Sequence, residues 1–105
     1  MYIIVVGAGA AGLYIASLLV KAEQKVAIVE QSEEVAEYVH HQLDVGVALG
    51  NAATPRVLRQ VDVHRADLLV ATTSSDETNI ITCIMAKELG AKKTVARVRN
   101  PEYSG

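Results

Sequence analysis

Cysteine, basic charge and large aromatic residues are all scarce in this sequence of 105 residues. A single cysteine excludes a disulfide framework and a zinc cluster built on cysteine ligands. The 10 Lys and Arg residues are outnumbered by 12 Asp and Glu, for a formal net charge of −2, so nothing predicts attraction to nucleic acid or to an anionic membrane. Trp and Phe are absent. The core must therefore be built from Val, Ile, Leu and Ala, as buried parallel strands are.

Long apolar runs are also missing. The run at residues 13–20 is far shorter than the roughly 20 residues that a membrane-spanning helix needs. Residues 1–6 carry no positively charged side chain, which does not fit a secretory signal. We therefore expect a cytoplasmic protein without direct membrane insertion. Half of the residues (50%) are hydrophobic, and a chain of this length suits one domain, residues 1–105, rather than two cores.

Short β-branched runs alternate with helix-like stretches along the chain. Strands are expected at residues 2–6, 25–30, 45–49, 68–72 and 94–98. This alternation predicts right-handed crossovers and a parallel sheet covered on both faces. The expected fold class is α/β, a Rossmann-type doubly wound parallel sheet with five strands in the order 3-2-1-4-5. A complete dinucleotide fold has six strands, so the sheet is expected to be truncated before the sixth strand.

Capping residues predict where the helices begin and end. The first helix is expected at residues 11–22 and the second from residue 32. Thr54 is a candidate N-cap for the third helix, with Pro55 at the first helical position. Ser74 and Glu77 have the spacing of a capping box at the start of the fourth helix, and Gly90 is placed to end it.

The first strand leads directly into a glycine-rich turn. Residues Gly7, Ala8, Gly9, Ala10, Ala11 and Gly12 match the pattern G-x-G-x-x-G. In a dinucleotide-binding turn the first glycine permits the tight turn, the second lets the backbone approach a pyrophosphate, and the third lets the helix pack closely on the strand. Residues 1–20 contain no Lys or Arg, so backbone N–H groups and the positive end of the helix would have to meet the phosphate charge. The alternative is a turn needed only for packing.

Glu30 ends the second strand, 18 residues after Gly12. A carboxylate in this place accepts hydrogen bonds from both ribose hydroxyls of an adenosine. It also repels a 2′-phosphate, and neither Gln31 nor Ser32 supplies a cation to hold one. The sequence therefore favours NAD(H), or another adenosine nucleotide without a 2′-phosphate such as ATP, ADP or AMP, over NADP(H). The alternative role of Glu30 is to stabilise the dipole of the following helix.

Several longer motifs resemble the nucleotide-binding N-lobe of RCK domains, also called KTN or TrkA-N domains. The motifs are residues 1–9 (MYIIVVGAG), 49–52 (LGNA), 66–72 (ADLLVAT), 76–79 (DETN) and 96–103 (ARVRNPEY). The resemblance covers the whole chain. It implies a regulatory domain, with no catalytic residues, of potassium channels and of Trk or Ktr potassium-uptake systems. The C-terminal lobe of that family is expected to be absent here.

The resemblance also assigns residues to the nucleotide site. It places Asn51 near the adenine, makes Ala52 the next residue of the site, and places Arg97 on the fifth strand near the nucleotide or a subunit contact. Thr72 and Thr73 end the fourth strand beside the crevice in which ligands of open α/β sheets bind. Together with the glycine turn, Glu30 and Gln31, these are the candidate cofactor-binding residues.

Two departures from the family pattern bear on binding and on local structure. Ala10 and Ala11 stand where many members carry a long polar or basic residue, so a phosphate contact from that position is lost. The usual Gly-Asp-Ala-Thr is replaced here by the sequence GNAA at residues 50–53, so the threonine hydroxyl is missing. We expect Thr54 to cap the following helix instead.

No metal site and no nucleophile are expected. His40 and His41 are adjacent on a helix and point about 100° apart, and His64 stands in a polar turn. Cys83 lies among apolar residues of the fourth helix and is expected to be a small buried hydrophobe. The serines at 74–75 have no His or Lys nearby in the sequence to activate a hydroxyl.

The end of the chain predicts self-association. Ile80 and Ile84 belong to an apolar arc on the fourth helix that is wider than one sheet contact needs. The surplus would meet another subunit, or else the helix is covered within this domain. Arg97 and Arg99 share one face of the last strand, where their charge would discourage open-ended pairing.

Three functions remain open at this point. The favoured one is a regulatory nucleotide-binding domain that controls potassium transport by a ligand-dependent change in an assembly of its own kind, a dimer or larger ring, beside a membrane channel or transporter subunit. The second is the cofactor-binding half of an NAD-dependent oxidoreductase, although 105 residues leave no room for a substrate domain. The third is a plain sensor of ATP, ADP or AMP.

Overall fold

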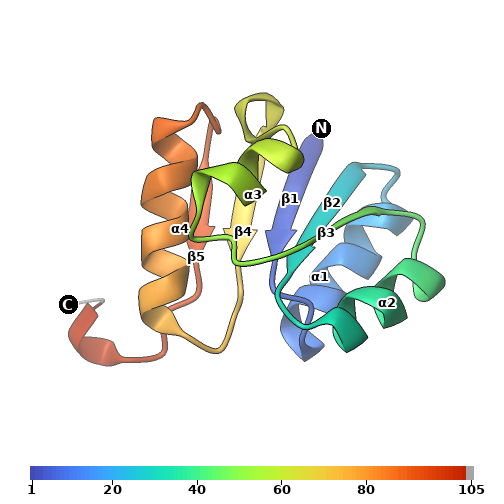
Figure 1. The fold of residues 1–105 in the computed structure, drawn as a ribbon, viewed down its shortest axis with the longest axis horizontal. Helices are drawn as coiled ribbons and strands as arrows, with labels where there is room; N and C mark the ends of the chain where they lie inside the picture. The colour runs from blue at the N-terminus through green and yellow to red at the C-terminus, as the bar shows by residue number, and fades with distance from the viewer. Residues whose placement is uncertain (104–105) are drawn as a thin grey trace.

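The computed structural model describes residues 1–103 and shows one parallel sheet covered by helices (Figure 1). The strands are β1 (Tyr2–Val6), β2 (Lys25–Glu30), β3 (Gly46–Leu49), β4 (Leu68–Ala71) and β5 (Thr94–Ala96). The helices are α1 (Ala10–Lys21), α2 (Glu33–Gln42), α3 (Pro55–Gln60) and α4 (Asp76–Glu88), with short 3₁₀ turns η1 (Val63–Arg65) and η2 (Pro101–Tyr103). The strand order is β3-β2-β1-β4-β5, with every pair parallel. The predicted fold and strand order are confirmed.

Each face of the sheet has its own core, built from small aliphatic side chains. Ile3, Val5 and Ile28 point to one face, where they pack with Ala16 of α1 and Val39 of α2. The alternate strand residues point to the other face, where α3 and α4 cover them. The main members of this second core are Ile4, Val6, Val29, Leu69, Val57, Leu58 and Ala86. Burial on both faces explains why the strands are continuous apolar runs rather than alternating ones.

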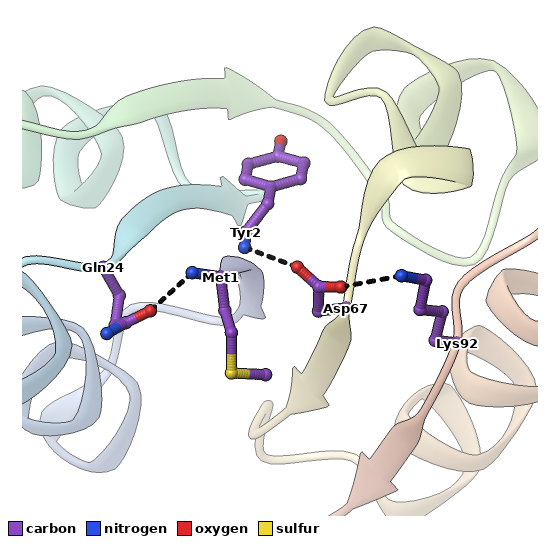
Figure 2. A network of polar contacts seen from close by, with 5 residues as sticks. All are labelled: Met1, Tyr2, Gln24, Asp67 and Lys92. Carbon is purple, nitrogen blue, oxygen red and sulfur yellow. Dashed lines mark hydrogen bonds and ion pairs between the residues drawn. The ribbon is translucent and has the colours of Figure 1, made fainter.

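Asp67 joins the amino ends of β1 and β4 (Figure 2), at the opposite end of the strands from the glycine turn (Figure 1). One carboxylate oxygen accepts the backbone N–H of Tyr2 at 2.8 Å, and the other pairs with Lys92 Nζ at 3.2 Å. The first of these bonds and then the Lys92 bond lower the pKa of Asp67. Beside them the amino group of Met1 donates to Gln24. The network ties β1 to β4 and to the turn before β5.

Two strands end earlier than predicted, and the reason is visible for β5. The prediction ran to residue 98, but the strand pairing stops at Ala96. Arg97 still donates its backbone N–H to Ala71 at 2.9 Å. Beyond it, the Asp76 carboxylate accepts the N–H groups of Arg99 and Asn100 at 3.0 and 2.8 Å, which draws the chain from the sheet edge toward the start of α4. Similarly, β4 ends at Ala71, one residue before the predicted end.

One predicted helix cap is wrong, and a second is right in position but makes no capping bond with its side chain. The N-cap of α4 is Ser75, whose Oγ accepts from Thr78 N at 3.1 Å, and not Ser74. Thr54 does occupy the N-cap position of α3, but its hydroxyl donates to the carbonyl of Asn51 at 2.7 Å instead of capping the helix. Gly90 ends α4 as predicted, with φ +114°, a conformation that favours glycine.

The outer side of α4 is uncovered among the described residues. Asn79, Thr82 and Cys83 are buried against the sheet, and burial raises the pKa of the Cys83 thiol, which is the small buried hydrophobe expected. Ile81 and Ile84, by contrast, are 48% and 60% exposed. The alternative in which this helix is covered within the domain is therefore wrong for residues 1–103.

The three histidines are exposed, as expected. Within residues 1–103, no three His, Cys, Asp or Glu side chains come together in a way that could hold a metal ion. In the same part of the chain, no helix has both the length and the apolar character required to cross a membrane.

Candidate functional site

A cleft of about 420 Å³ opens at the carboxyl ends of the strands. This is the edge at which open α/β sheets bind their ligands. The cleft is lined by the glycine turn, by the ends of β2 and β4, and by the segments that follow β3 and β5. Its polar and charged lining residues are Glu30, Gln31, Asn51, Thr72, Thr73, Ser74, Thr78, Arg97 and Arg99.

Two of the three glycines are needed for the shape of the turn itself. Gly7 has φ +91°, and a Cβ added there would lie 3.0 Å from the backbone nitrogen of Thr73. A Cβ added to Gly12 would lie 1.8 Å from the carbonyl oxygen of Gly7. Gly12 is therefore closed to any side chain by the protein's own backbone, whereas a side chain at Gly7 would be strained by its backbone angle and crowded by Thr73.

Gly9 is different, because nothing in the described protein explains it. A Cβ added there has no heavy atom within 4 Å, and the backbone angles, φ −69° and ψ −168°, suit an ordinary residue. The position lines the cleft directly before α1, and the first turn of α1 carries no acidic residue. Space that the fold leaves open at this glycine is space that an anionic group could occupy at the helix N-terminus.

Glu30 joins the end of β2 to the glycine turn. Its Oε1 accepts the backbone N–H of Ala8 at 2.8 Å, and its Oε2 accepts that of Ser32 at 2.6 Å. An ionised carboxylate offers about four lone-pair sites, so two bonds fix its orientation and leave acceptor capacity toward the cleft. Ser32 itself caps α2, with its Oγ accepting from Val35 N at 3.3 Å, so Glu30 is not the cap of that helix.

The threonines at the end of β4 are engaged by the protein. The Thr72 hydroxyl is buried and donates to the carbonyls of Val6 and Gly7 at 3.1 and 3.2 Å, which holds β4 against the glycine turn. The Thr73 hydroxyl donates to Asn79 Oδ1 at 2.7 Å, and its backbone N–H donates to the same oxygen at 2.9 Å. Both threonines line the cleft, yet their hydroxyls primarily shape it.

Arg97 lies just beyond β5 rather than on it. Its guanidinium Nη2 donates to the carbonyls of Thr72 and Thr73 at 2.9 and 3.0 Å. Its own carbonyl accepts from Asn79 Nδ2 at 2.9 Å. Its Nε is buried with no hydrogen-bond partner among the described residues. Asn79 and Arg97 together fasten the two walls of this end of the cleft.

The structure brings nearly all of the predicted site residues together. Every candidate lines the cleft except Ala8 and Gly12. Ala8 contributes its N–H to Glu30, and Gly12 lies in the packing contact beneath the turn. Three further polar residues line the cleft without having been predicted from the sequence: Ser74, Thr78 and Arg99. Alternation with Arg97 could have found Arg99, whereas Ser74 was assigned to a helix cap.

The charged groups of the cleft are separated along the sheet. Among the lining residues only Glu30, Arg97 and Arg99 are charged, and none is His, Lys or Cys. The strand order places Glu30, the last residue of β2, and the two arginines, after β5, on opposite sides of the uncharged glycine turn. Such a cleft can orient a ligand that has hydroxyls at one end and anionic groups along its middle.

A family model described as the TrkA-N domain matches residues 3–105. A Trk system potassium uptake protein TrkA homolog from Methanothermobacter thermautotrophicus is 34% identical over 103 residues, which cover 98% of this chain and 48% of that protein. The chain therefore spans about half the length of this curated relative.

Two solved structures share the fold. The NAD(P)-binding domain of an exopolyphosphatase-related protein from Archaeoglobus fulgidus is 24% identical, with a TM-score of 0.84 over 95% of this chain and 74% of that one. The Kef CTD of Shewanella denitrificans in its AMP-bound form is 21% identical, with a TM-score of 0.76 over 90% of this chain and 57% of that one. At these identities the likeness concerns the fold alone.

The domain match over residues 3–105 and the TrkA relative together confirm the resemblance noted in the sequence, and the chain belongs to the TrkA-N domain family.

Proposed function

We propose that this domain binds an adenine nucleotide without a 2′-phosphate, NAD(H) first among them, and that binding regulates potassium transport. The observation that carries the binding proposal is Glu30, held by Ala8 and Ser32 at the junction of β2 and the glycine turn. The remaining acceptor sites of this carboxylate suit the two ribose hydroxyls of an adenosine. ATP, ADP and AMP meet the same requirement, and AMP is the ligand of the Kef structure.

In this proposal the phosphates lie at the glycine turn. Gly9 leaves room for the diphosphate, and the N–H groups at the start of α1 face it with the positive end of the helix dipole. Asn51 and Ala52 lie beside the adenine. Gln31, next to Glu30, brings no charge that could hold a 2′-phosphate.

The proposed role is regulation and not catalysis. No lining residue of the cleft is a His, Lys or Cys that could serve as a base or nucleophile. The relative is named as a potassium uptake protein, and this chain corresponds to about half of it. We propose that ligand binding favours one arrangement of an oligomeric assembly over another, at the cytoplasmic side of a membrane potassium transporter. The oxidoreductase alternative predicts hydride exchange between NADH and a keto acid or dye, which the regulatory proposal does not.

The first prediction concerns Glu30. Replacing Glu30 by Ala is expected to weaken NADH binding by roughly 1.5–3 kcal/mol, the range for hydrogen bonds to a charged group. Isothermal titration calorimetry of both proteins measures the difference. The matched control is Glu34→Ala, which removes the same charge from the exposed first turn of α2. Equal dissociation constants for Glu30→Ala and the wild type would exclude the ribose contact.

The second prediction concerns Gly9. Gly9→Val is expected to abolish nucleotide binding, because its side chain fills the space proposed for the diphosphate. The fold should survive, because a Cβ at Gly9 meets no protein atom within 4 Å. The expected loss of stability is about 1 kcal/mol, the difference between Gly and a β-branched residue at an N-cap. Circular dichroism reports folding, and a nucleotide-induced rise in melting temperature reports binding.

Gly12→Ala provides the contrast, because its Cβ would overlap the Gly7 carbonyl and the variant should unfold. If a folded Gly9→Val protein still shows the nucleotide-induced rise in melting temperature, the glycine turn serves packing only and does not bind the diphosphate.

The third prediction concerns self-association. We propose that the exposed side of α4, with Ile81 and Ile84, meets a second copy of the chain. A closed symmetric dimer is the smallest assembly that covers such a patch. Light scattering at about 100 µM, which exceeds the dissociation constant of any contact worth roughly −6 kcal/mol or more, should give a mass above that of the monomer. Ile84→Glu should lower that mass, whereas Leu18→Glu, at a similarly exposed position on α1, should not. A monomer in all three proteins would contradict the proposal.

A further inference from the structure

Arg99 is a cleft residue that the adenosine and the first phosphate do not account for. It lines the cleft with Arg97 after β5, at the end opposite Glu30. Neighbouring strands lie about 4.8 Å apart, so the end of β5 is roughly 10 Å from the end of β1, where the glycine turn begins. The two arginines therefore face the part of a ligand that extends past the glycine turn.

Arg97 and Arg99 are held in place by different means. The guanidinium of Arg97 is fixed by the carbonyls of Thr72 and Thr73. Arg99 lies three residues beyond the end of β5, where no strand pairing holds the chain. There the backbone is held by Asp76, whose Oδ1 accepts from Arg99 N at 3.0 Å and whose Oδ2 accepts from Asn100 N at 2.8 Å.

Both oxygens of Asp76 are thus committed to the segment that carries Arg99. These two backbone bonds are the leading causes that lower the pKa of Asp76, followed by the charges of Arg99 and Arg97. The carboxylate is ionised at neutral pH and sits at the first position of α4, a helix that Asn79 also ties to Arg97. The Arg99 segment therefore depends on α4 and not on the sheet.

We propose that Asp76 is a positioning residue that holds Arg99 at the cleft wall, where Arg99 and Arg97 bind an anionic group of the ligand beyond its first phosphate. This inference rests on the proposed nucleotide site and specifies its ligand class. A nucleoside di- or triphosphate reaches the arginines, and a nucleoside monophosphate ends at the glycine turn. Guanidinium groups suit this task because their planar donors match phosphate oxygens.

Removing the charge of Asp76 distinguishes two roles that this residue could have in ligand binding. If Asp76 acted only through its negative charge, removing that charge beside two arginines would strengthen the binding of a polyphosphate. If Asp76 acts by positioning Arg99, removing one of its two acceptor oxygens weakens the same binding. The two roles therefore predict opposite changes in polyphosphate affinity for the same substitution.

The experiment compares AMP and ATP by calorimetry, in the presence of EDTA, on the wild-type chain and on Asp76→Asn. The expected result is that Asp76→Asn weakens ATP binding about tenfold, the lower end of what a lost hydrogen bond to a charged group costs. AMP binding should change by less than about twofold, the level of an ordinary surface substitution. Asp44→Asn is the matched control, because it removes an exposed carboxylate that does not line the cleft.

Arg99→Gln is the second variant, and it tests the anion contact even if Asp76→Asn does not fold. It leaves the backbone bonds to Asp76 in place and should give the same loss for ATP and none for AMP. ATP binding that is unchanged or tighter in folded Asp76→Asn would overturn the positioning role. Unchanged ATP binding in Arg99→Gln would overturn the anion contact.

The two levels of the proposal fail in different ways. If AMP binds the wild type and depends on Glu30, but ATP binds no more tightly than AMP, the contact with Arg99 is wrong and the proposed function stands. If the wild type binds NADH but neither AMP nor ATP, the contact with Arg99 is wrong and the proposed function stands. If it binds none of the three, both are wrong.

Discussion

The site depends on the contact between the glycine turn and the end of β4. Because Gly12 has no Cβ, α1 can begin directly against the carbonyl of Gly7. The same carbonyl accepts the buried hydroxyl of Thr72, which also bonds to Val6. This contact sets the position of the backbone N–H of Ala8, and through it the orientation of the Glu30 carboxylate. The glycine turn, the Glu30 carboxylate and the β4 wall of the cleft are therefore held in fixed positions relative to one another by connected contacts.

Local patterns predicted the fold and most of the residues that line the cleft, because the β-branched strands, the G-x-G-x-x-G turn and Glu30 all lie within segments that fold in a standard way. What the sequence did not predict depends on bonds between distant segments. The end of β5 and the place of Arg99 are decided by Asp76, 23 residues earlier in the chain. The shift of the α4 cap from Ser74 to Ser75 accompanies the bonds of Thr73 to Asn79. Periodicity and capping rules concern neighbouring residues in the sequence, so they do not predict bonds between such distant segments.

Helix α4 connects the cleft with the surface proposed for self-association. Its buried Asn79 holds Thr73 and Arg97, and its first residue, Asp76, holds the Arg99 segment. Its opposite side exposes Ile81 and Ile84. A ligand that tightens the β5 end of the cleft thus acts on the same rigid helix that would meet another subunit. These contacts offer a physical basis for the proposed regulation, because a ligand in the cleft would shift the position of α4 and thereby affect the subunit contact.

The proposed function depends on Glu30 selecting an adenosine whose ribose is not phosphorylated at the 2′ position. Calorimetric titration of the wild-type chain with NADH and with NADPH tests it most directly, because the two ligands differ only in that phosphate. NADH is expected to bind, and NADPH is expected to bind at least about tenfold more weakly, since like charges placed together cost several kcal/mol. Equal affinity for the two ligands, or tighter binding of NADPH, would contradict it.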